Sequence, residues 1–329
     1  LLVGLGNKGS EEEAPGPTLA PTTEYTVQES HLLSLLPDFA LQAIADSEIA
    51  TPQSIALAWL LEDPNLASYQ DDQILQRYAM ATYYYATGGD GHDNTTQWLN
   101  TTHWLSYDHH ECDWFQLRQY PVADKLFNYS YQLDDYLGDE PCHKDKKLKH
   151  LWHYRFGLGG TLPKELSLLT SLVSIDVAYN DLAGTIPSQF GQLTQLELLW
   201  LFANKDLAGA LPTELGLLTN LVDFAAIATS ITGSIPSELG LLSSSLEVYM
   251  QDNTLVSGTL PSELGLLTNL HILYLNTNLL TGAIPSELGR LTSMLDFGLE
   301  TNALTGTVPT ELASLSDVGF LFLQENHLT

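Results

Sequence analysis

A pattern of apolar and polar positions about 24 residues long repeats from about residue 148 to the end of the chain. Residues 258–281 show it in full, with the spacing Leu-x-x-Leu-x-Leu followed by Asn, and with Gly and Pro at fixed places. One proline recurs every 24 or 25 residues, at Pro163, Pro187, Pro212, Pro236, Pro261, Pro285 and Pro309. A fixed period of this length predicts a solenoid in which each unit stacks on the next.

Each unit predicts one short strand and a return path. Apolar residues alternate in the middle of the unit, so one side chain points inward and the next outward. A single strand cannot bury its apolar side, and we therefore expect the strands to pair in parallel along a continuous core. The Gly-x-Leu-Pro stretch predicts a tight extended segment, and Pro-Ser-Glu-Leu-Gly predicts a short helical turn on the outer, convex side. Eight strands are expected, starting near Leu148, Leu172, Leu196, Leu221, Ser245, Leu270, Met294 and Val318. The predicted fold class is an α/β solenoid with a parallel β-sheet on its concave face.

An asparagine follows the strand in most units. We expect this column to be buried, with its amides bonded to backbone groups at the turn that leaves each strand. Its members are Asn180, Asn204, Asn253, Asn278, Asn302 and Asn326. The fourth unit has Thr229 at this position and Ala226 in the core, and the fifth has Ser245 in place of the first Leu. The core is expected to be thinner there.

The chain before the repeats is predicted to be helical. Apolar periodicity from Leu32 to Ile44 predicts one helix, Thr51-Pro52 begins a second, and residues 71–87 form a third that stops at Gly88-Gly89. The run Tyr83-Tyr84-Tyr85 is expected to pack against neighbouring helices rather than to bind a ligand. We predict a helical cap domain over residues 31–143 and a solenoid over residues 144–329.

The segment before this helical region has a different character. Residues 10–30 are acidic and rich in Pro and predict a flexible tether. Residues 1–9 begin without Met on an apolar run, and two interpretations stay open: the end of a signal or membrane segment that lies upstream of residue 1, or a processing boundary. The Gly-x-Gly-x-x-Gly spacing at Gly4–Gly9 lacks the strand and helix that a dinucleotide site needs.

Charge narrows the set of partners. Forty Asp and Glu residues against 12 Lys and Arg residues give a formal charge of −28, which argues against nucleic acid and anionic membranes as partners. No run of 18 apolar residues is present. Residues 144–149 nevertheless contain four lysines, and they are either a solvated edge or a docking point for an acidic neighbour.

Two cysteines, Cys112 and Cys142, are too few for a disulfide scaffold and lack the spacing of a zinc site, so one bridge is the simplest interpretation. Three Asn-x-Ser/Thr glycosylation motifs lie around them, at Asn94, Asn100 and Asn128, and favour a secreted or cell-surface protein. The His-His-Glu-Cys-Asp run at residues 109–113 is not a helical metal motif. We predict no metal, no cofactor and no enzymatic activity, because no nucleophile–base pair or phosphate loop is found.

The repeat resembles the plant-type leucine-rich repeat of receptor-like kinases and receptor-like proteins over residues 148–329. Residues 59–64 (Trp-Leu-Leu-Glu-Asp-Pro) and residues 111–114 (Glu-Cys-Asp-Trp), together with Cys142, resemble the cysteine-paired N-terminal cap of these ectodomains. The tether and the Tyr-rich segment look more like leucine-rich-repeat surface proteins of diatom-type algae. The resemblance implies a right-handed superhelix behind a disulfide-bridged cap, and a ligand-binding role outside the cell. The eighth unit stops within the repeat at Thr329, and we expect further repeats or a partner to follow it.

Outward-facing strand residues are the candidates for ligand binding. Large aromatic side chains beside carboxylates on an exposed face suit a peptide, protein or glycan ligand. The candidates are Trp152, Tyr154, Asp176, Trp200, Phe202, Asp223, Glu247, Tyr249, Tyr274 and Asn276. The predicted function is a non-catalytic recognition or adhesion module. The alternative is a structural protein that self-assembles into an extracellular filament, wall or adhesive layer.

Overall fold

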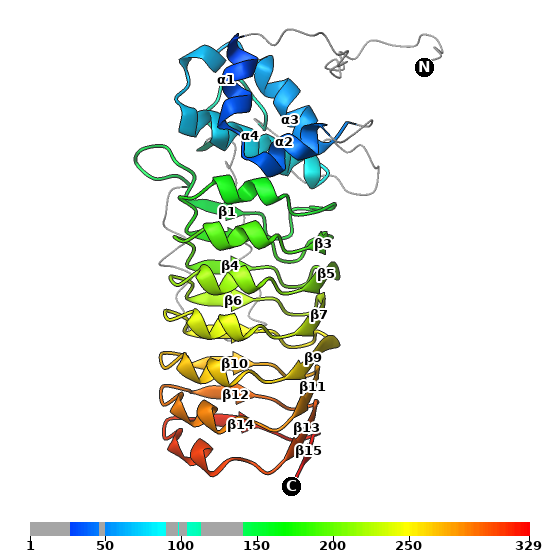
Figure 1. Ribbon diagram of the computed structural model, residues 1–329, viewed down its shortest axis with the longest axis vertical. Helices are drawn as coiled ribbons and strands as arrows, with labels where there is room; N and C mark the ends of the chain where they lie inside the picture. Colours follow the sequence, from blue (N-terminus) through cyan, green and yellow to red (C-terminus); the bar gives the residue numbers. More distant parts are fainter. Residues whose placement is uncertain (1–26, 46–49, 90–97, 99–103, 113–140) are drawn as a thin grey trace, which may run out of the picture.

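A helical cap covers one end of an elongated stack of repeats (Figure 1). The computed structural model describes residues 27–45, 50–89, 98, 104–112 and 141–329. Residues 10–26 of the predicted tether, the segment 1–9 and the glycosylation motifs at Asn94, Asn100 and Asn128 lie outside these residues. The last four residues of the predicted tether, 27–30, are not extended, because a helix begins at Val27. Within the described residues, no helix has both the length and the apolar character needed to cross a bilayer.

The described part of the cap includes the α-helices α1 (Val27–Leu35), α2 (Asp38–Ala45), α3 (Pro52–Leu61) and α4 (Asp71–Ala86) and the 3₁₀ turn η1 (Leu66–Ser68). The prediction of a single helix from Leu32 to Ile44 is wrong, because the chain breaks at Pro37 and α2 begins at the next residue. Proline has no backbone N–H and disfavours a helical conformation of the residue before it. The predicted start at Thr51 is confirmed by a capping box in which Thr51 and Ser54 exchange side-chain hydrogen bonds.

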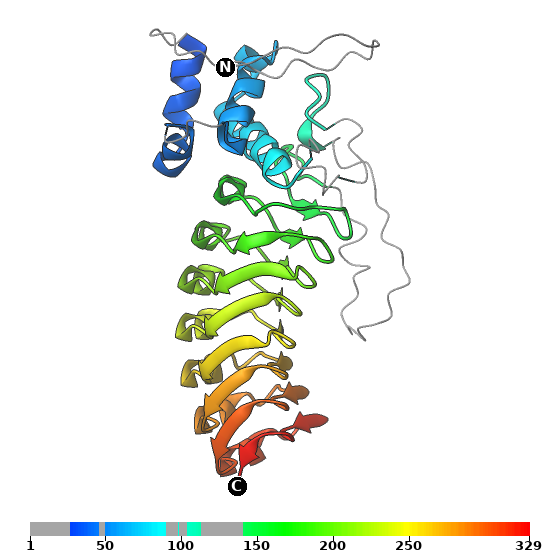
Figure 2. The ribbon, with the colours of Figure 1, turned by 90° about the vertical axis from the view of Figure 1, so that its right-hand side faces the viewer.

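The concave face carries the eight parallel strands that the repeat predicts, which run across the stack in Figure 1 and are seen nearly end-on in Figure 2. Each strand pairs with the next unit in an unbroken register, so that Leu151, Ile175 and Leu199 lie side by side. The strands are β1 (His150–Trp152), β2 (Ser174–Asp176), β4 (Leu198–Trp200), β6 (Asp223–Ala225), β8 (Glu247–Tyr249), β10 (Ile272–Tyr274), β12 (Asp296–Gly298) and β14 (Phe320–Phe322).

A second parallel sheet of seven strands was not predicted. Its strands run into the Gly-x-Leu-Pro stretch of each unit. They are too short to show a clear alternation of apolar and polar residues in the sequence. Its strands are β3 (Ala183–Thr185), β5 (Asp206–Ala210), β7 (Ser230–Ser234), β9 (Leu255–Thr259), β11 (Leu279–Gly282), β13 (Ala303–Gly306) and β15 (His327–Leu328).

The predicted helical turns on the convex side are one-turn 3₁₀ helices, each beginning after a proline. They are η3 (Lys164–Leu168), η4 (Ser188–Gln192), η5 (Thr213–Leu217), η6 (Ser237–Leu241), η7 (Ser262–Leu266), η8 (Ser286–Arg290) and η9 (Thr310–Ser314). A Cβ on Gly216 would overlap the backbone carbonyl of Glu238 in the next turn. Glycine at this place therefore allows neighbouring 3₁₀ helices to stack closely.

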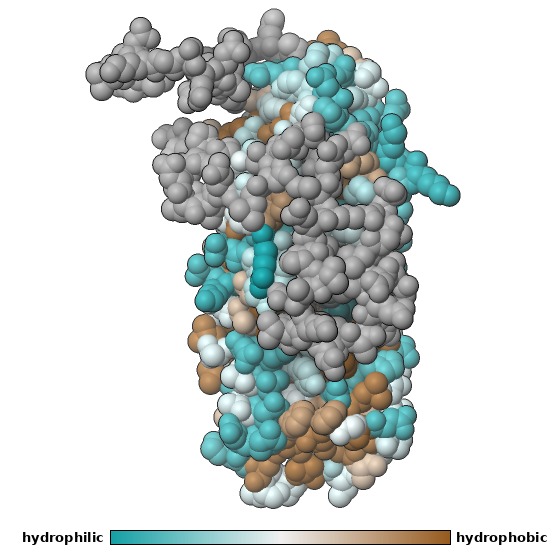
Figure 3. Space-filling view, turned by 180° about the vertical axis from the view of Figure 1, so that it is seen from behind, coloured by the Kyte–Doolittle hydropathy of each residue, from teal (hydrophilic) through white to brown (hydrophobic). Residues whose placement is uncertain are grey.

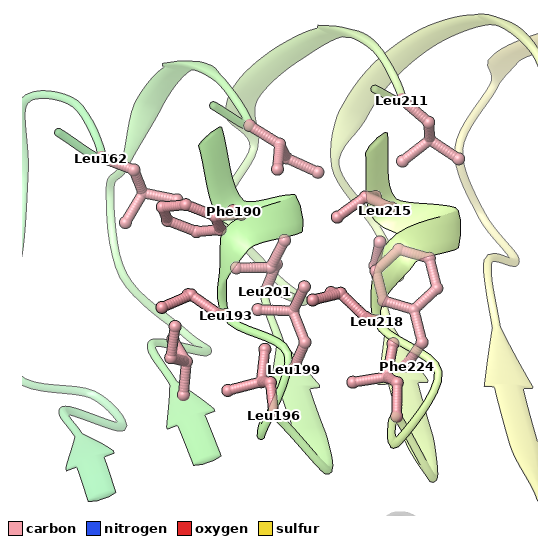
Figure 4. Packing of buried hydrophobic residues seen from close by; sticks show 14 of the residues in the cluster. Leu162, Phe190, Leu193, Leu196, Leu199, Leu201, Leu211, Leu215, Leu218 and Phe224 are labelled. Atoms are coloured by element: carbon pink, nitrogen blue, oxygen red, sulfur yellow. The ribbon is translucent and has the colours of Figure 1, made fainter. Parts of the chain in front are cut away.

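The core is a single apolar cluster that runs from the cap through the solenoid. Leucines from the strand and from the 3₁₀ helix of each unit meet in its centre, as Leu199, Leu201 and Leu215 do in Figure 4. The thinner core expected near the fourth unit amounts to a cavity of about 10 Å³ among Phe224, Val248 and Leu273. That volume is at or below what one water molecule needs.

The asparagine column joins consecutive units. Asn204 Nδ2 donates to the carbonyl oxygens of Leu201 (2.8 Å) and, one unit earlier, of Val177 (3.0 Å), and its Oδ1 accepts from Leu182 N–H (3.0 Å). The residue before it, Ala203, has φ = +57°, and the corresponding residue of every other unit from Tyr179 to Glu325 is also left-handed. Such a backbone costs roughly 1–2 kcal/mol in a non-glycine residue. The asparagine bonds hold this turn in place, with similar contacts at Asn180, Asn253, Asn278, Asn302 and Asn326.

The junction of cap and solenoid is aromatic. Tyr83 is fully buried; its ring packs against His153 and Trp98, and its hydroxyl lies 3.1 Å from His153 Nδ1. The predicted packing role of the Tyr83-Tyr84-Tyr85 run is confirmed. Burial lowers the pKa of His153 to about 3, so the ring is neutral at physiological pH. The Cys112–Cys142 disulfide also connects the two parts, and Cys142 pairs with Leu148 in an isolated β-bridge at the entrance to the repeats.

Candidate ligand-binding surface

All ten predicted binding residues lie on the side of the eight-stranded sheet that points away from the core, which is the concave face of the solenoid. Seven lie within the strands, where they alternate with inward residues such as Leu199, and Tyr154, Phe202 and Asn276 come shortly after a strand ends. The strand register places Asp176 beside Trp200, and Tyr249 beside Tyr274. The structure therefore brings onto one face side chains that are spread along the sequence from Trp152 to Asn276.

Half of these side chains are not open to solvent, contrary to the expectation of an exposed face. Trp200 is 7% exposed and Tyr249 is 3% exposed, and Asp176, Phe202 and Glu247 are also buried. The aromatic residues form an apolar cluster of their own on this face, in which Phe202 contacts Tyr179 and Tyr249 contacts Tyr274, with ring centroids 5.4 and 5.7 Å apart. Stacking units bring large rings close enough to exclude water from one another.

Two carboxylates face each other within this buried region. Asp223 and Glu247 are register partners on β6 and β8, and the hydroxyl of Tyr249 donates to Glu247 Oε2 at 2.7 Å. Burial raises the pKa of Asp223 well above its usual value, and the neighbouring Glu247 raises it further. Burial also raises the pKa of Glu247, against the hydrogen bond from Tyr249 and the nearby His271. Asp223 and Glu247 can therefore share a proton or bind a cationic group.

This pair makes stability depend on pH. A carboxyl whose folded pKa is raised binds more protons in the folded state, so its contribution to stability falls as pH rises through the interval between the unfolded and folded pKa values. We expect Asp223→Asn to be more stable than the parent at pH 7 by on the order of 1 kcal/mol, with little difference at pH 4. Thermal unfolding from pH 4 to 8 measures this, with exposed Asp206→Asn as the control. A stability difference that does not grow with pH would contradict the effect.

The surface over β10 and β12, toward the C-terminal end, is more open. Tyr274 and Asn276 are partly exposed, as are Asp296 and Glu300. Figure 3 shows apolar surface next to polar surface at this end of the molecule. The Tyr274 hydroxyl lies 3.5 Å from Asp296 Oδ2, and burial raises the pKa of Tyr274 to about 12, so the phenol stays protonated. Burial also raises the pKa of Glu300.

Asp296 and Glu300 are not among the ten predicted residues. They occupy the same outward columns as Asp223 and Asn276, one or more units further on. The spacing of the repeat could therefore have identified them as candidates. Within the described part of the His-His-Glu-Cys-Asp run, residues 109–112, Glu111 is fully buried and accepts from Arg77 Nη1 at 2.8 Å. Across the described ranges, no cluster of His, Cys, Asp and Glu is arranged to hold a metal ion.

A repeated coil made of a concave strand, an asparagine-bonded turn, a second strand and a 3₁₀ helix defines a leucine-rich-repeat domain. The family model described as Leucine Rich Repeat matches residues 171–193 and 269–291. No curated protein matches the chain in sequence.

Among solved structures, the repeats are similar to those of plant receptor ectodomains. A plant peptide hormone receptor, RGFR1 in complex with RGF2, is 31% identical with a TM-score of 0.53 over 54% of this chain and 28% of the receptor chain. The ectodomain of the Arabidopsis receptor kinase HAESA, in complex with an N-terminally extended IDA peptide hormone, is 33% identical with a TM-score of 0.50 over 55% of this chain and 30% of its own. The chain spans less than a third of the length of either receptor structure.

Proposed function

We propose that this protein is an extracellular, non-catalytic recognition module that binds a peptide on the concave face of its leucine-rich repeats. The observation that carries the proposal is the row of aromatic and acidic side chains on and just after β10 and β12, which is partly exposed next to a buried part of the same sheet. The two plant receptors named above, each in complex with a peptide hormone, support the class of ligand.

The side chains suggest what the peptide contains. Tyr274 offers an aromatic surface, while Asp296 and Glu300 offer two carboxylates near it. An aromatic anchor beside carboxylates suits a peptide with a Lys or Arg next to an apolar residue. Neighbouring strands lie about 4.8 Å apart, so β10, β12 and β14 together span roughly 10 Å, enough for about three extended residues.

The buried part of the face has a supporting role in this proposal. Trp200, Phe202 and Tyr249 pack against their neighbours, and Tyr249 is in ring contact with Tyr274. A binding side chain that is held by packed neighbours loses less entropy when a ligand arrives. The Cys112–Cys142 disulfide agrees with a location outside the cell, where such bonds persist.

The test is a selection from a displayed library of random peptides, followed by calorimetry of the enriched peptides. We expect enrichment of peptides with a basic residue, and we expect Tyr274→Ala to weaken their binding by about tenfold or more. The control is Leu279→Ala, a change to an exposed side chain of the second sheet. Failure to enrich any peptide, or equal affinity of the Tyr274→Ala protein, would count against the proposal. Regular fibres of purified protein in electron micrographs would favour the structural alternative.

A further inference from the structure

A groove of about 810 Å³ lies where the cap meets the solenoid, beside the segments that lead into β1, β2 and β4. One wall is the turn over residues 142–149, which projects beside β1 in Figure 1, and the other consists of segments that lead into β2 and β4. The polar groups that matter for binding are Lys144, Lys147, Lys149, Thr170, Ser171 and Gln195. The function proposed above does not use this groove.

The groove is a positive region on a strongly negative protein. Three of the 12 Lys and Arg residues in a chain of formal charge −28 line it. Among the described residues, Lys147 Nζ lies 3.2 Å from Asp72 Oδ2, and the backbone N–H of Lys147 donates to Asp145 Oδ1 at 3.3 Å. The described lining therefore contains three lysines and one carboxylate, that of Asp145.

The turn that carries the lysines is held in one shape. Cys142 is in the disulfide and pairs with Leu148, and within the turn His143 N–H donates to Lys147 O at 2.8 Å and Lys146 N–H donates to His143 O at 2.9 Å. His143 Nε2 also lies 3.0 Å from Ser171 O across the groove. A preformed arrangement of charges reduces the entropy that binding costs.

We infer that this groove binds an acidic oligosaccharide, one that carries sulfate or carboxylate groups. The lining contains lysine but no arginine, and lysine acts as a point charge that attracts anions without the planar geometry of a bidentate pair. Thr170, Ser171 and Gln195 supply hydroxyl and amide groups next to the lysines, which match the hydroxyls of a sugar. Val173 is the only residue of the described lining with a wholly apolar side chain.

The experiment measures binding of the intact protein to four chain-length-matched probes: sulfated dextran, oligogalacturonate, neutral dextran and poly-glutamate. We expect one or both acidic sugars to bind, more tightly than neutral dextran and poly-glutamate, and to bind more weakly as salt is raised. Comparing sulfated dextran with oligogalacturonate distinguishes a ligand that carries sulfate from one that carries carboxylate. We expect the double variant Lys144→Gln/Lys149→Gln to bind the preferred sugar about tenfold more weakly.

The matched control removes the same number of charges elsewhere, with Lys205→Gln/Arg290→Gln in the exposed loops and turns of the solenoid. This control is expected to bind like the parent protein. An equal loss in both double variants would mean that net charge alone drives binding and would overturn the inference. So would tight binding of poly-glutamate, which would assign the groove to an acidic peptide, or binding of none of the four probes. The proposed peptide-binding face does not overlap this groove, so the outcome of the peptide experiment does not depend on the outcome of the sugar experiment.

Discussion

Replacing Arg77 with Ala is expected to lower the free energy of unfolding of the cap by about 3–5 kcal/mol. The guanidinium is 1% exposed and pairs with two fully buried carboxylates, Glu111 Oε1 at 2.8 Å and Asp63 Oδ2 at 3.3 Å. Trp59 and Tyr69 lie within cation–π distance of it, with ring centroids 5.2 and 5.0 Å away. Removing the cation leaves two buried carboxylates without the Arg77 charge, although Tyr69 still donates to Asp63 and Gln76 to Glu111. This cost exceeds that of a lost surface ion pair.

Chemical denaturation followed by tryptophan fluorescence measures this change, because Trp59 and Trp104 are buried in the cap. The matched control is Arg290→Ala on η8, where the side chain is exposed and the change should stay within about 0.5 kcal/mol. If both alanine variants unfold at the same denaturant concentration, the Arg77 cluster does not carry the stability assigned to it.

Removing the disulfide is expected to have the second largest effect. Cys112 and Cys142 have a sequence separation of 30, and in the chain-entropy account a closed loop of this length stabilises the folded state by about 3–4 kcal/mol. Replacing both cysteines by Ser avoids a leftover thiol. We expect the double variant to unfold at a lower denaturant concentration and to be cut earlier by protease.

Reduction of the parent protein provides an independent comparison, since it removes the same covalent bond without changing the sequence. The reduced parent and the Cys112→Ser/Cys142→Ser protein should show similar unfolding midpoints. A midpoint equal to that of the oxidised parent would mean that contacts such as the one between Leu148 N–H and Gln76 Oε1 (2.7 Å) already hold the junction.

The parts of the fold that could be predicted are those with a local cause. Leu199 and Leu201 alternate because the strand does, and Asn204 follows the strand because the left-handed turn at Ala203 needs its amide. The helix break at Pro37 also has a local cause. It was overlooked because the apolar periodicity continues on both sides of the proline. Arg77 gave no such signal, since its partners Asp63 and Glu111 are distant in sequence and meet it only in the folded cap.

For the candidate binding surface as well, some features could be predicted from the sequence and others could not. The columns of outward residues follow from the period of the repeat, and the structure places all ten predicted residues in them. Their burial does not follow, because it depends on which rings meet across neighbouring units. The proximity of Tyr249 to Tyr274 and of Asp223 to Glu247 is a property of the register, whereas the raised pKa values of Asp223 and Glu247 arise mainly from burial. A list of outward residues therefore predicted which side chains lie on this face of the sheet, but not which of them remain accessible.

The orientation of the strands has a mechanical consequence. The strands of both sheets lie across the long axis of the molecule, so the hydrogen bonds between units point along that axis (Figure 1). Tension applied to the two ends of the solenoid would load one inter-unit boundary at a time, and each unit that detached would release about 80 Å of chain. The disulfide would exclude the loop between Cys112 and Cys142 from this extension. Under force, such a solenoid would lengthen in steps of nearly equal size.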